Sequence, residues 1–410
     1  MEIFWLIFLF VLGASIGSFL NVVVWRYPRG ESIVFPGSHC PSCGKAIRAY
    51  DNIPVLSWLI LRGRCRQCGV KISARYIVVE TMAGCLVAGL WVAYYLLGVR
   101  DGVGAGETIP AAWADSWMMF AAHGALLLAL LVCSLIDLEY WILPIEACWI
   151  VALFGAAMAA ADPHPWMPAV SPVVGAMSIA AGVGLVLSLL AVKFGFLERS
   201  FIDADGAGAE SEQNQTGEET SDKKSKRDRR AEEMVVTSEH GVNPRLEIVK
   251  EVVFLAPAGV LAVLTWAALT YWSGLDHWWT SVASRDAGGY APHVNALLSS
   301  LFGFLIGGLW IWGARILGTL GVGKEAMGMG DVHLLAAVGA VTGWIVPSLT
   351  FWIAPLVTLL MILWTMSSRK HRALPYGPGL AAGTIVVMLA YDLLIDFIGP
   401  AARIIAGQAP

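Results

Sequence analysis

The sequence has few charged residues for its length. Lys, Arg, Asp and Glu make up 14% of the 410 residues, whereas hydrophobic residues make up 57%, with a mean hydropathy of +0.67. Soluble globular domains carry about 25% charged residues. The shortage of charge therefore excludes an ordinary soluble protein. The net charge of −4 is uninformative, because the charges are segregated along the chain. We expect the lipid bilayer to be a partner and expect no nucleic-acid partner.

The N-terminal apolar run lacks the features of a cleaved signal peptide. It begins Met-Glu and has neither a basic segment before the apolar run nor a small-residue cleavage site after it, both of which secretory signal peptides carry. We therefore expect this run to be retained as the first transmembrane helix.

Long apolar runs are abundant. About 20 apolar residues in a helix cross about 30 Å of hydrocarbon. Runs that approach this length lie at 3–25, 76–99, 117–136, 143–161, 172–196, 251–272, 295–317, 331–348, 350–366 and 377–398. The sequence thus predicts an all-α polytopic membrane protein with about ten transmembrane helices.

Basic residues fall on one side of these runs. With the N-terminus outside, all 27 Lys and Arg residues except Arg100, Arg285 and Arg403 lie on the inner side. Because cytoplasmic loops carry the excess of Lys and Arg, this pattern predicts that both termini face outward. The segments 26–75 and 199–250 then face the cytosol.

Cysteines form two close pairs in the first inner segment. The stretches "CPSCGK" and "CRQCGV" each place two thiols before a glycine, as a zinc ribbon does. The alternative is a pair of chance or redox CxxC motifs. We predict a structural zinc site in a ribbon domain, 26–75, with four ligands: Cys40, Cys43, Cys65 and Cys68.

Two aspartates lie at the inner ends of apolar runs. Asp137 ends the third run and Asp331 begins the eighth, so both are expected at one depth. Close carboxylates share one proton and work together as acid and base, as in aspartic proteases. The glycines Gly328 and Gly330 would allow a sharp turn before Asp331. The alternative is a proton or cation relay in a transporter.

Several stretches resemble the bacterial prepilin peptidase family, also called type IV leader peptidases. Most of "GASIGSFLNVVVWRYPRGESIVFPGSHCPSCGKAIRAYDNIPVLSWLILRGRCRQCGVKISARYIVVE" is similar to the family's N-terminal block. Further similarity lies in "SLIDLEYWILP", "GKEAMGMGDVHLLAAVGAVTGW" and "LPYGPGLAAG". The second of these contains the GxGD signature of intramembrane aspartic proteases. The resemblance implies that Asp137 and Asp331 are the catalytic pair.

The resemblance also implies a second activity and a location. Family members cut the basic leader from prepilins and pseudopilins of type IV pili and type II secretion, at the cytosolic face of the bacterial inner membrane. They then methylate the new N-terminus with S-adenosylmethionine. No recognisable Gly-rich nucleotide loop is present, so we place the methyl donor only loosely near the ribbon. The candidate residues, whose alternative role is helix packing, are Ser18, Asn21, Arg26 and Glu80.

The chain departs from the family pattern in two places. The two aspartates are separated by an extra pair of apolar runs, 172–196 and 251–272, joined by a polar segment that we predict to be flexible. His333 stands where family members usually carry lysine. The predicted divisions are a first helix at 1–25, the ribbon at 26–75, helices at 76–198, the insertion at 199–250 and helices at 251–410. A transporter or scaffold whose ribbon binds a partner stays an alternative function.

Overall fold

The computed structural model describes residues 2–40, 42–100, 109–162, 164, 166–198, 200, 244–367 and 374–397. In these residues the secondary structure is helical apart from two isolated β-bridges, which confirms the all-α prediction. The helices are α1 (Glu2–Arg26), α2 (Leu56–Ile60), α3 (Arg75–Trp91), α4 (Ile109–Tyr140), α5 (Ile145–Ala161), α6 (Pro172–Lys193), α9 (Pro244–Tyr271), α10 (Ser273–Ala283), α11 (Ala291–Val322), α12 (Met329–Thr342), α13 (Ile345–Ser367) and α14 (Gly377–Leu389).

Every predicted apolar run is helical where the structure describes it, but the runs differ in length. In the described part of the chain, seven helices are long and apolar enough to cross a membrane, or eight if the bent pair Gly377–Leu389 and Tyr391–Phe397 is one span. Ile145–Ala161 and Met329–Thr342 are shorter apolar helices. The run 331–348 is cut short because Gly343 has a left-handed backbone, with φ of +79°, which ends α12.

The polar segment 199–250 lies largely outside the described residues. Its last seven residues, 244–250, belong to α9, so this helix begins earlier than the apolar run 251–272 suggested. The short helix α10, which no apolar run predicted, follows α9 directly.

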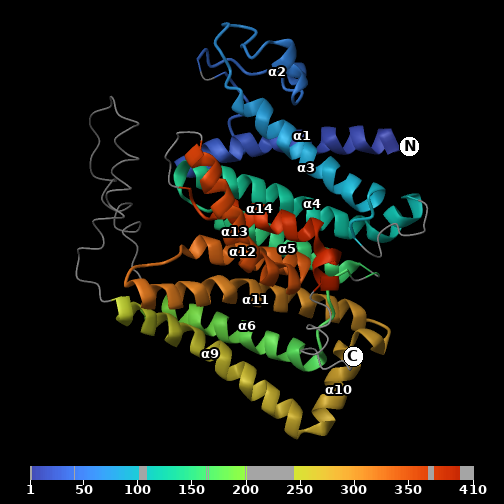
Figure 1. The fold of residues 1–410 in the computed structure, drawn as a ribbon, viewed down its shortest axis with the longest axis vertical. Coiled ribbons are helices and arrows are strands. Elements are labelled where there is room, and N and C mark those ends of the chain that lie inside the picture. Colours follow the sequence, from blue (N-terminus) through green and yellow to red (C-terminus); the bar gives the residue numbers. More distant parts are fainter. Residues whose placement is uncertain are drawn as a thin grey trace. The chain divides into compact units, whose positions relative to one another are not determined.

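The chain divides into two compact units. The first contains Met1–Ser171, Ser281–Trp310 and Met329–Pro410, and the second contains Pro172–Thr280 and Ile311–Gly328. In the first unit α1 packs on α3, and α12 contacts α4, α5, α13 and α14. In the second, α6 and α9 form an antiparallel pair, drawn green and yellow in Figure 1.

Small residues let helices approach closely within each unit. A Cβ on Gly13 of α1 would lie 2.7 Å from the carbonyl oxygen of Ala83 on α3. A Cβ on Gly184 of α6 would lie 2.4 Å from the Cα of Ala258 on α9. Close backbone contact through small residues is how membrane helices associate without a hydrophobic driving force between them.

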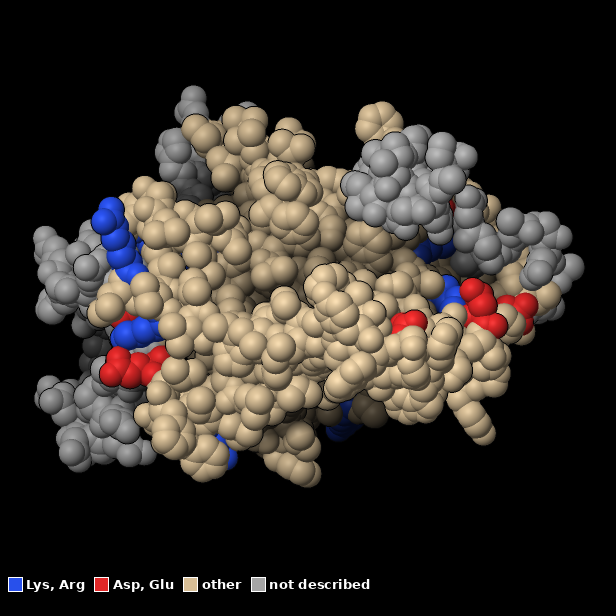
Figure 2. Space-filling view, turned by 90° about the horizontal axis from the view of Figure 1, so that it is seen from below, with Lys and Arg blue, Asp and Glu red and all other residues tan. Residues whose placement is uncertain are grey.

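Large apolar side chains are exposed along the long helices. Val263 and Leu264 on α9 and Leu360 on α13 are examples, with exposed fractions of 59%, 58% and 66%. Figure 2 shows one face on which residues other than Lys, Arg, Asp and Glu form a broad continuous surface. Such surfaces suit hydrocarbon rather than water. The chain is a multi-pass membrane protein.

Candidate active site and metal centre

Asp137 lies near the end of α4 and is 6% exposed. Its Oδ2 accepts a hydrogen bond of 3.2 Å from the backbone N–H of Gly377, the first residue of α14. The N-terminus of a helix stabilises negative charge. A Cβ at Gly377 would lie only 2.5 Å from Oδ2, so the contact requires glycine. Helix α14 therefore presents a backbone donor to this carboxylate.

Asp331 lies in the first turn of α12 and is 8% exposed. Its Oδ1 is buried and has no hydrogen-bond partner among the residues that the structure describes. Helix α12 contacts both α4 and α14, and the charge of Asp137 acts electrostatically on Asp331. The structure thus brings the two predicted carboxylates, 194 positions apart in sequence, into one buried region of the first unit.

The sequence suggested that the two glycines before Asp331 allow a sharp turn, and the structure shows their backbone conformation. Neither Gly328 nor Gly330 has a positive φ, and Gly330 is already helical. A Cβ on Gly330 would lie 2.7 Å from the Cβ of Leu143. Glycine is needed at position 330 because Leu143, in the segment between α4 and α5, lies directly against it.

Two further residues near the carboxylates escaped the sequence analysis. Besides Gly377, Tyr376 lies close to the pair: burial and the negative charge of Asp331 raise the pKa of its phenol to about 12. Tyr376 is therefore a neutral hydrogen-bonding group at physiological pH. Both residues belong to the stretch "LPYGPGLAAG", and a glycine-proline start to an apolar helix was the signal that could have indicated them.

Other polar residues near these helix ends already have partners. Glu139 pairs with Arg75 at 2.6 Å, and Glu146 accepts a 2.5 Å hydrogen bond from Tyr27. His333 contacts the carbonyl oxygen of Met329 through Nδ1 at 2.9 Å. These contacts set Asp331, with its unpartnered buried oxygen, apart from its acidic neighbours.

The four predicted cysteine ligands lie together. One Sγ from each of Cys40, Cys43, Cys65 and Cys68 falls within 4.8 Å of the others. Zinc–sulfur distances of about 2.3 Å in a tetrahedron place sulfurs about 3.8 Å apart, and the Sγ atoms of Cys40 and Cys68 are 3.7 Å apart. The thiols therefore fit a four-coordinate metal ion.

The two CxxC turns have the same backbone structure. Cys40 N donates to Lys45 O at 3.0 Å, and Cys65 N donates to Val70 O at 2.9 Å. The glycine after each pair, Gly44 and Gly69, has a φ near +70°. Backbone N–H groups of Cys43 and Ser42 lower the pKa of the Cys40 thiol to about 6, which favours the thiolate that metals bind.

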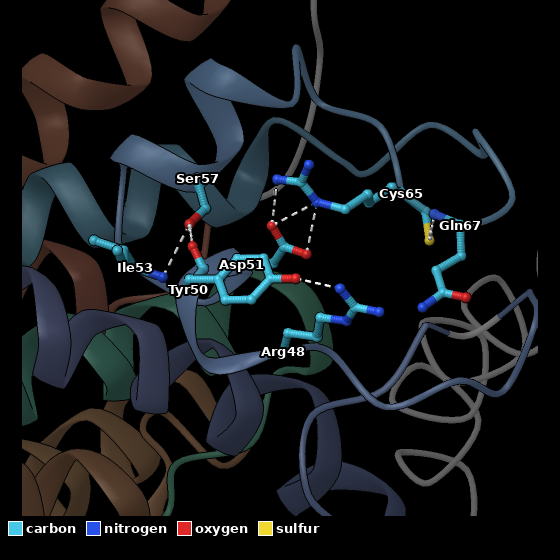
Figure 3. Close-up of polar contacts among 8 residues, drawn as sticks. Arg48, Tyr50, Asp51, Ile53, Ser57, Cys65 and Gln67 are labelled. Atoms are coloured by element: carbon cyan, nitrogen blue, oxygen red, sulfur yellow. Dashed lines mark hydrogen bonds and ion pairs between the residues drawn. The ribbon is translucent and has the colours of Figure 1, made fainter.

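Polar contacts brace the ribbon away from the thiols. Figure 3 shows Asp51 held by the guanidinium of Arg66, with a shortest distance of 2.7 Å, and Ser57 bridging the backbone of Tyr50 and Ile53. The ribbon is also tied to the helices of the first unit. Glu80 on α3 accepts a 2.7 Å hydrogen bond from the backbone N–H of Val55.

The residues suggested for the methyl donor are only partly brought together. Ser18 and Arg26 line a pocket of about 480 Å³ between α1 and the ribbon, with Val34, Pro36 and Asn52 among its other walls. Arg26 donates to the carbonyl oxygens of Ser32 and Pro36 at 2.9 and 2.7 Å.

The other two candidates, Asn21 and Glu80, form hydrogen bonds with neighbouring segments. Asn21 donates to the carbonyl oxygen of Tyr76, and Glu80 accepts hydrogen bonds from Val55 and Ser18. Neither Asn21 nor Glu80 lines the pocket.

These features define a multi-pass helical membrane protein with a buried carboxylate pair and a four-thiol ribbon. Residues 11–94 match the family model of the bacterial peptidase A24 N-terminal domain. This part of the chain is thus similar to the N-terminal domain of that peptidase family.

Relatives share parts of the sequence. A prepilin leader peptidase/N-methyltransferase from Myxococcus xanthus is 44% identical over 154 residues, covering 37% of this chain and 40% of the relative. A type 4 prepilin-like proteins leader peptide-processing enzyme from Escherichia coli is 40% identical over 150 residues, 32% of this chain and 48% of the relative. The chain thus spans less than half of these relatives' lengths. No solved structure matches.

Proposed function

We propose that this chain is an aspartic peptidase that removes the basic leader of prepilin-like proteins, with Asp137 and Asp331 as its catalytic pair. The observation that carries the proposal is the burial of these two carboxylates on contacting helices, where the charge of one acts on the other. The match of residues 11–94 to the A24 N-terminal domain and the names of the relatives support the reaction and the substrate.

The surroundings of the two carboxylates suggest how they divide the work. The N–H of Gly377 and the N-terminus of α14 stabilise negative charge on Asp137, whereas the buried Oδ1 of Asp331 has no donor. We therefore assign the ionised, water-activating role to Asp137 and the shared proton to Asp331. Asp137 takes a proton from water, which attacks the peptide carbonyl, and Asp331 donates its proton to the carbonyl oxygen. The C–N bond of the tetrahedral intermediate then breaks as Asp137 passes its proton to the leaving amine and Asp331 takes back the proton from the intermediate's hydroxyl, which restores both carboxyl groups.

The cytosolic face of the bacterial inner membrane is the proposed site of reaction. The distribution of Lys and Arg supports this orientation, because it puts the ribbon and both aspartates on the inner side. Zinc is the proposed metal of the ribbon, since four clustered thiols prefer it. A four-thiolate site leaves no coordination position for water, so the proposed role of the ion is structural. It would hold the two CxxC turns together.

N-methylation of the new N-terminus is the proposed second activity. The relatives' names support it, as does the pocket beside the ribbon that Ser18 and Arg26 line. S-adenosylmethionine would be the methyl donor. The chain's own contribution would be to hold the donor beside the amine that cleavage releases.

Replacing either aspartate with its amide tests the peptidase. We expect Asp137→Asn and Asp331→Asn each to lower kcat for leader cleavage by at least about 100-fold, because acid–base catalysis contributes this much or more. The measurement is cleavage of a purified prepilin by the full chain in detergent. Asp286→Asn, the same change at an exposed residue, is the control.

The same variants distinguish the peptidase from the alternative transporter. Cleavage at the wild-type rate by both amide variants would remove the catalytic assignment. A proton relay would then be tested by proton uptake into vesicles that contain the same variants.

A further inference from the structure

A buried ion pair lies in the second unit, outside the carboxylate site. Glu251 on α9 and Arg315 on α11 are each 2% exposed, and Arg315 Nε donates to Glu251 Oε1 at 2.9 Å. Trp312 Nε1 donates to the other oxygen, Oε2, at 3.0 Å. Both oxygens of the carboxylate are thus engaged, and the charge of Arg315 is neutralised without water.

The remaining donors of Arg315 hold the segment that follows α11. Its Nη1 donates to the carbonyl oxygen of Met327 at 2.8 Å and forms an ion pair of 2.7 Å with Glu325. Thr319, one turn further along α11, accepts a hydrogen bond of 3.2 Å from the backbone N–H of Ala326. The last turns of α11 therefore fix three consecutive residues of this segment.

This segment leads directly to one of the proposed catalytic residues. Met327 lies two positions before the start of α12 and four before Asp331. Residues 323–328 are the covalent connection between α11 and α12. Whatever fixes the backbone at Met327 thus limits where α12 and its carboxylate can begin.

The counter-charge for Arg315 comes from the added pair of helices. Glu251 belongs to α9, which packs on α6 in the second unit, and both are part of the region that separates the two aspartate motifs. A buried arginine needs a paired carboxylate, because an uncompensated charge in an apolar interior is costly. Of the two carboxylates that pair with Arg315, the α6–α9 pair supplies the buried one, Glu251, whereas Glu325 is exposed.

We propose that Arg315, held by Glu251, is a positioning residue for leader cleavage, and that the α6–α9 pair is therefore required for an ordered approach to Asp331. This inference rests on the proposed peptidase function. Arg315 touches neither substrate nor reacting atoms in it. It acts by fixing Glu325 and Met327 through the contacts described above.

The Arg315→Lys variant distinguishes the effect of the guanidinium's hydrogen bonds from the effect of its positive charge. Lysine keeps the positive charge for Glu251, but its single ammonium cannot reproduce the guanidinium contacts to Glu251 and Met327 together. We expect kcat for leader cleavage to fall about 10- to 100-fold with KM within twofold, because small misplacements of catalytic groups cost this much. Arg285→Lys is the matched control, since Arg285 also donates to a backbone carbonyl, that of Met167.

Hydrogen–deuterium exchange tests the positioning without substrate. We expect the amides of residues 323–330 to exchange at least about tenfold faster in Arg315→Lys and in Glu251→Gln than in the wild type. The matched Arg285→Lys variant should exchange at the wild-type rate there. If the wild type does not cleave prepilin, the peptidase proposal fails, while the exchange rates still decide whether Arg315 orders this segment.

Unchanged exchange in residues 323–330 in both variants would overturn the inference, as would wild-type kcat in folded Arg315→Lys. Should either variant fail to fold in detergent, Trp312→Phe decides the matter. It removes only the N–H bond to Glu251 and keeps a ring to pack on Phe254. Faster exchange in this variant supports the inference, and wild-type exchange contradicts it.

Discussion

At the scale of residues, the close approach of Gly377 to Asp137 limits which side chains can be placed beside this carboxylate. The sequence indicated the two aspartates because a carboxylate at the end of an apolar run is conspicuous. It did not indicate Gly377, because the glycine-proline start of the helix predicts a helix end but not which side chain its backbone N–H will contact. The proximity of Asp137 and Asp331 could be established only from the fold. The two residues are 194 positions apart in sequence, and local patterns do not show which distant residues interact electrostatically.

Gly377→Ala should inactivate the peptidase while leaving the protein folded. The added methyl group would lie 2.5 Å from Asp137 Oδ2, so the carboxylate must move or α14 must shift. We expect kcat for leader cleavage to fall about 100-fold. Gly124→Ala on α4, where nothing lies within 4 Å of the added carbon, should keep the wild-type rate. Equal rates in the two variants would contradict the assigned role of Gly377.

At the scale of elements, the ribbon and the helices depend on different interactions. Within the described part of residues 27–74, Cys40 is the one hydrophobic residue that is buried. With almost no apolar core, the ribbon must take its folding energy from the metal and from polar contacts. The spacing of the four cysteines correctly predicted that their thiols lie together. The ends of helices were predicted less well. The sequence does not distinguish Gly343 from the other small residues of its apolar run, and only its left-handed backbone conformation shows that α12 ends there.

Removing a thiol should unfold the ribbon and leave the transmembrane helices intact. We expect Cys65→Ser to lose at least about tenfold in zinc affinity, because three thiols remain where four are needed. Metal content by elemental analysis and limited proteolysis within residues 30–73 measure the effect. Cys85→Ser, an exposed cysteine outside the cluster, should retain the metal and resist the protease. Full metal content in Cys65→Ser would refute the four-thiol site.

At the scale of the whole molecule, charge and hydropathy predicted a multi-pass membrane protein but not its division into two units. Apolar runs are visible in sequence because they are local. The grouping of α6, α9 and the end of α11 follows from contacts such as the 2.7 Å hydrogen bond from Ser188 to the carbonyl oxygen of Phe254 and the 2.9 Å hydrogen bond from Arg315 to Glu251. Such contacts depend on which small and polar residues face each other, which composition does not reveal.

Reporter fusions test the orientation that the basic residues predict. We expect alkaline phosphatase, which is active only outside the cytoplasm, to be active when fused after Ala283 and inactive after Arg75 or Val322. Green fluorescent protein at the same positions should give the opposite pattern. Phosphatase activity after Arg75 would place the ribbon outside and exclude the proposed cytosolic reaction.

The pairing of Glu251 with Arg315 has a consequence for how such chains change over generations. Deleting α9 alone would remove the buried carboxylate partner of Arg315 and leave it with the exposed Glu325, and an exposed ion pair stabilises a protein only weakly. Chains without the added helices should therefore carry an uncharged residue in place of this arginine. The two features should be inherited together or lost together.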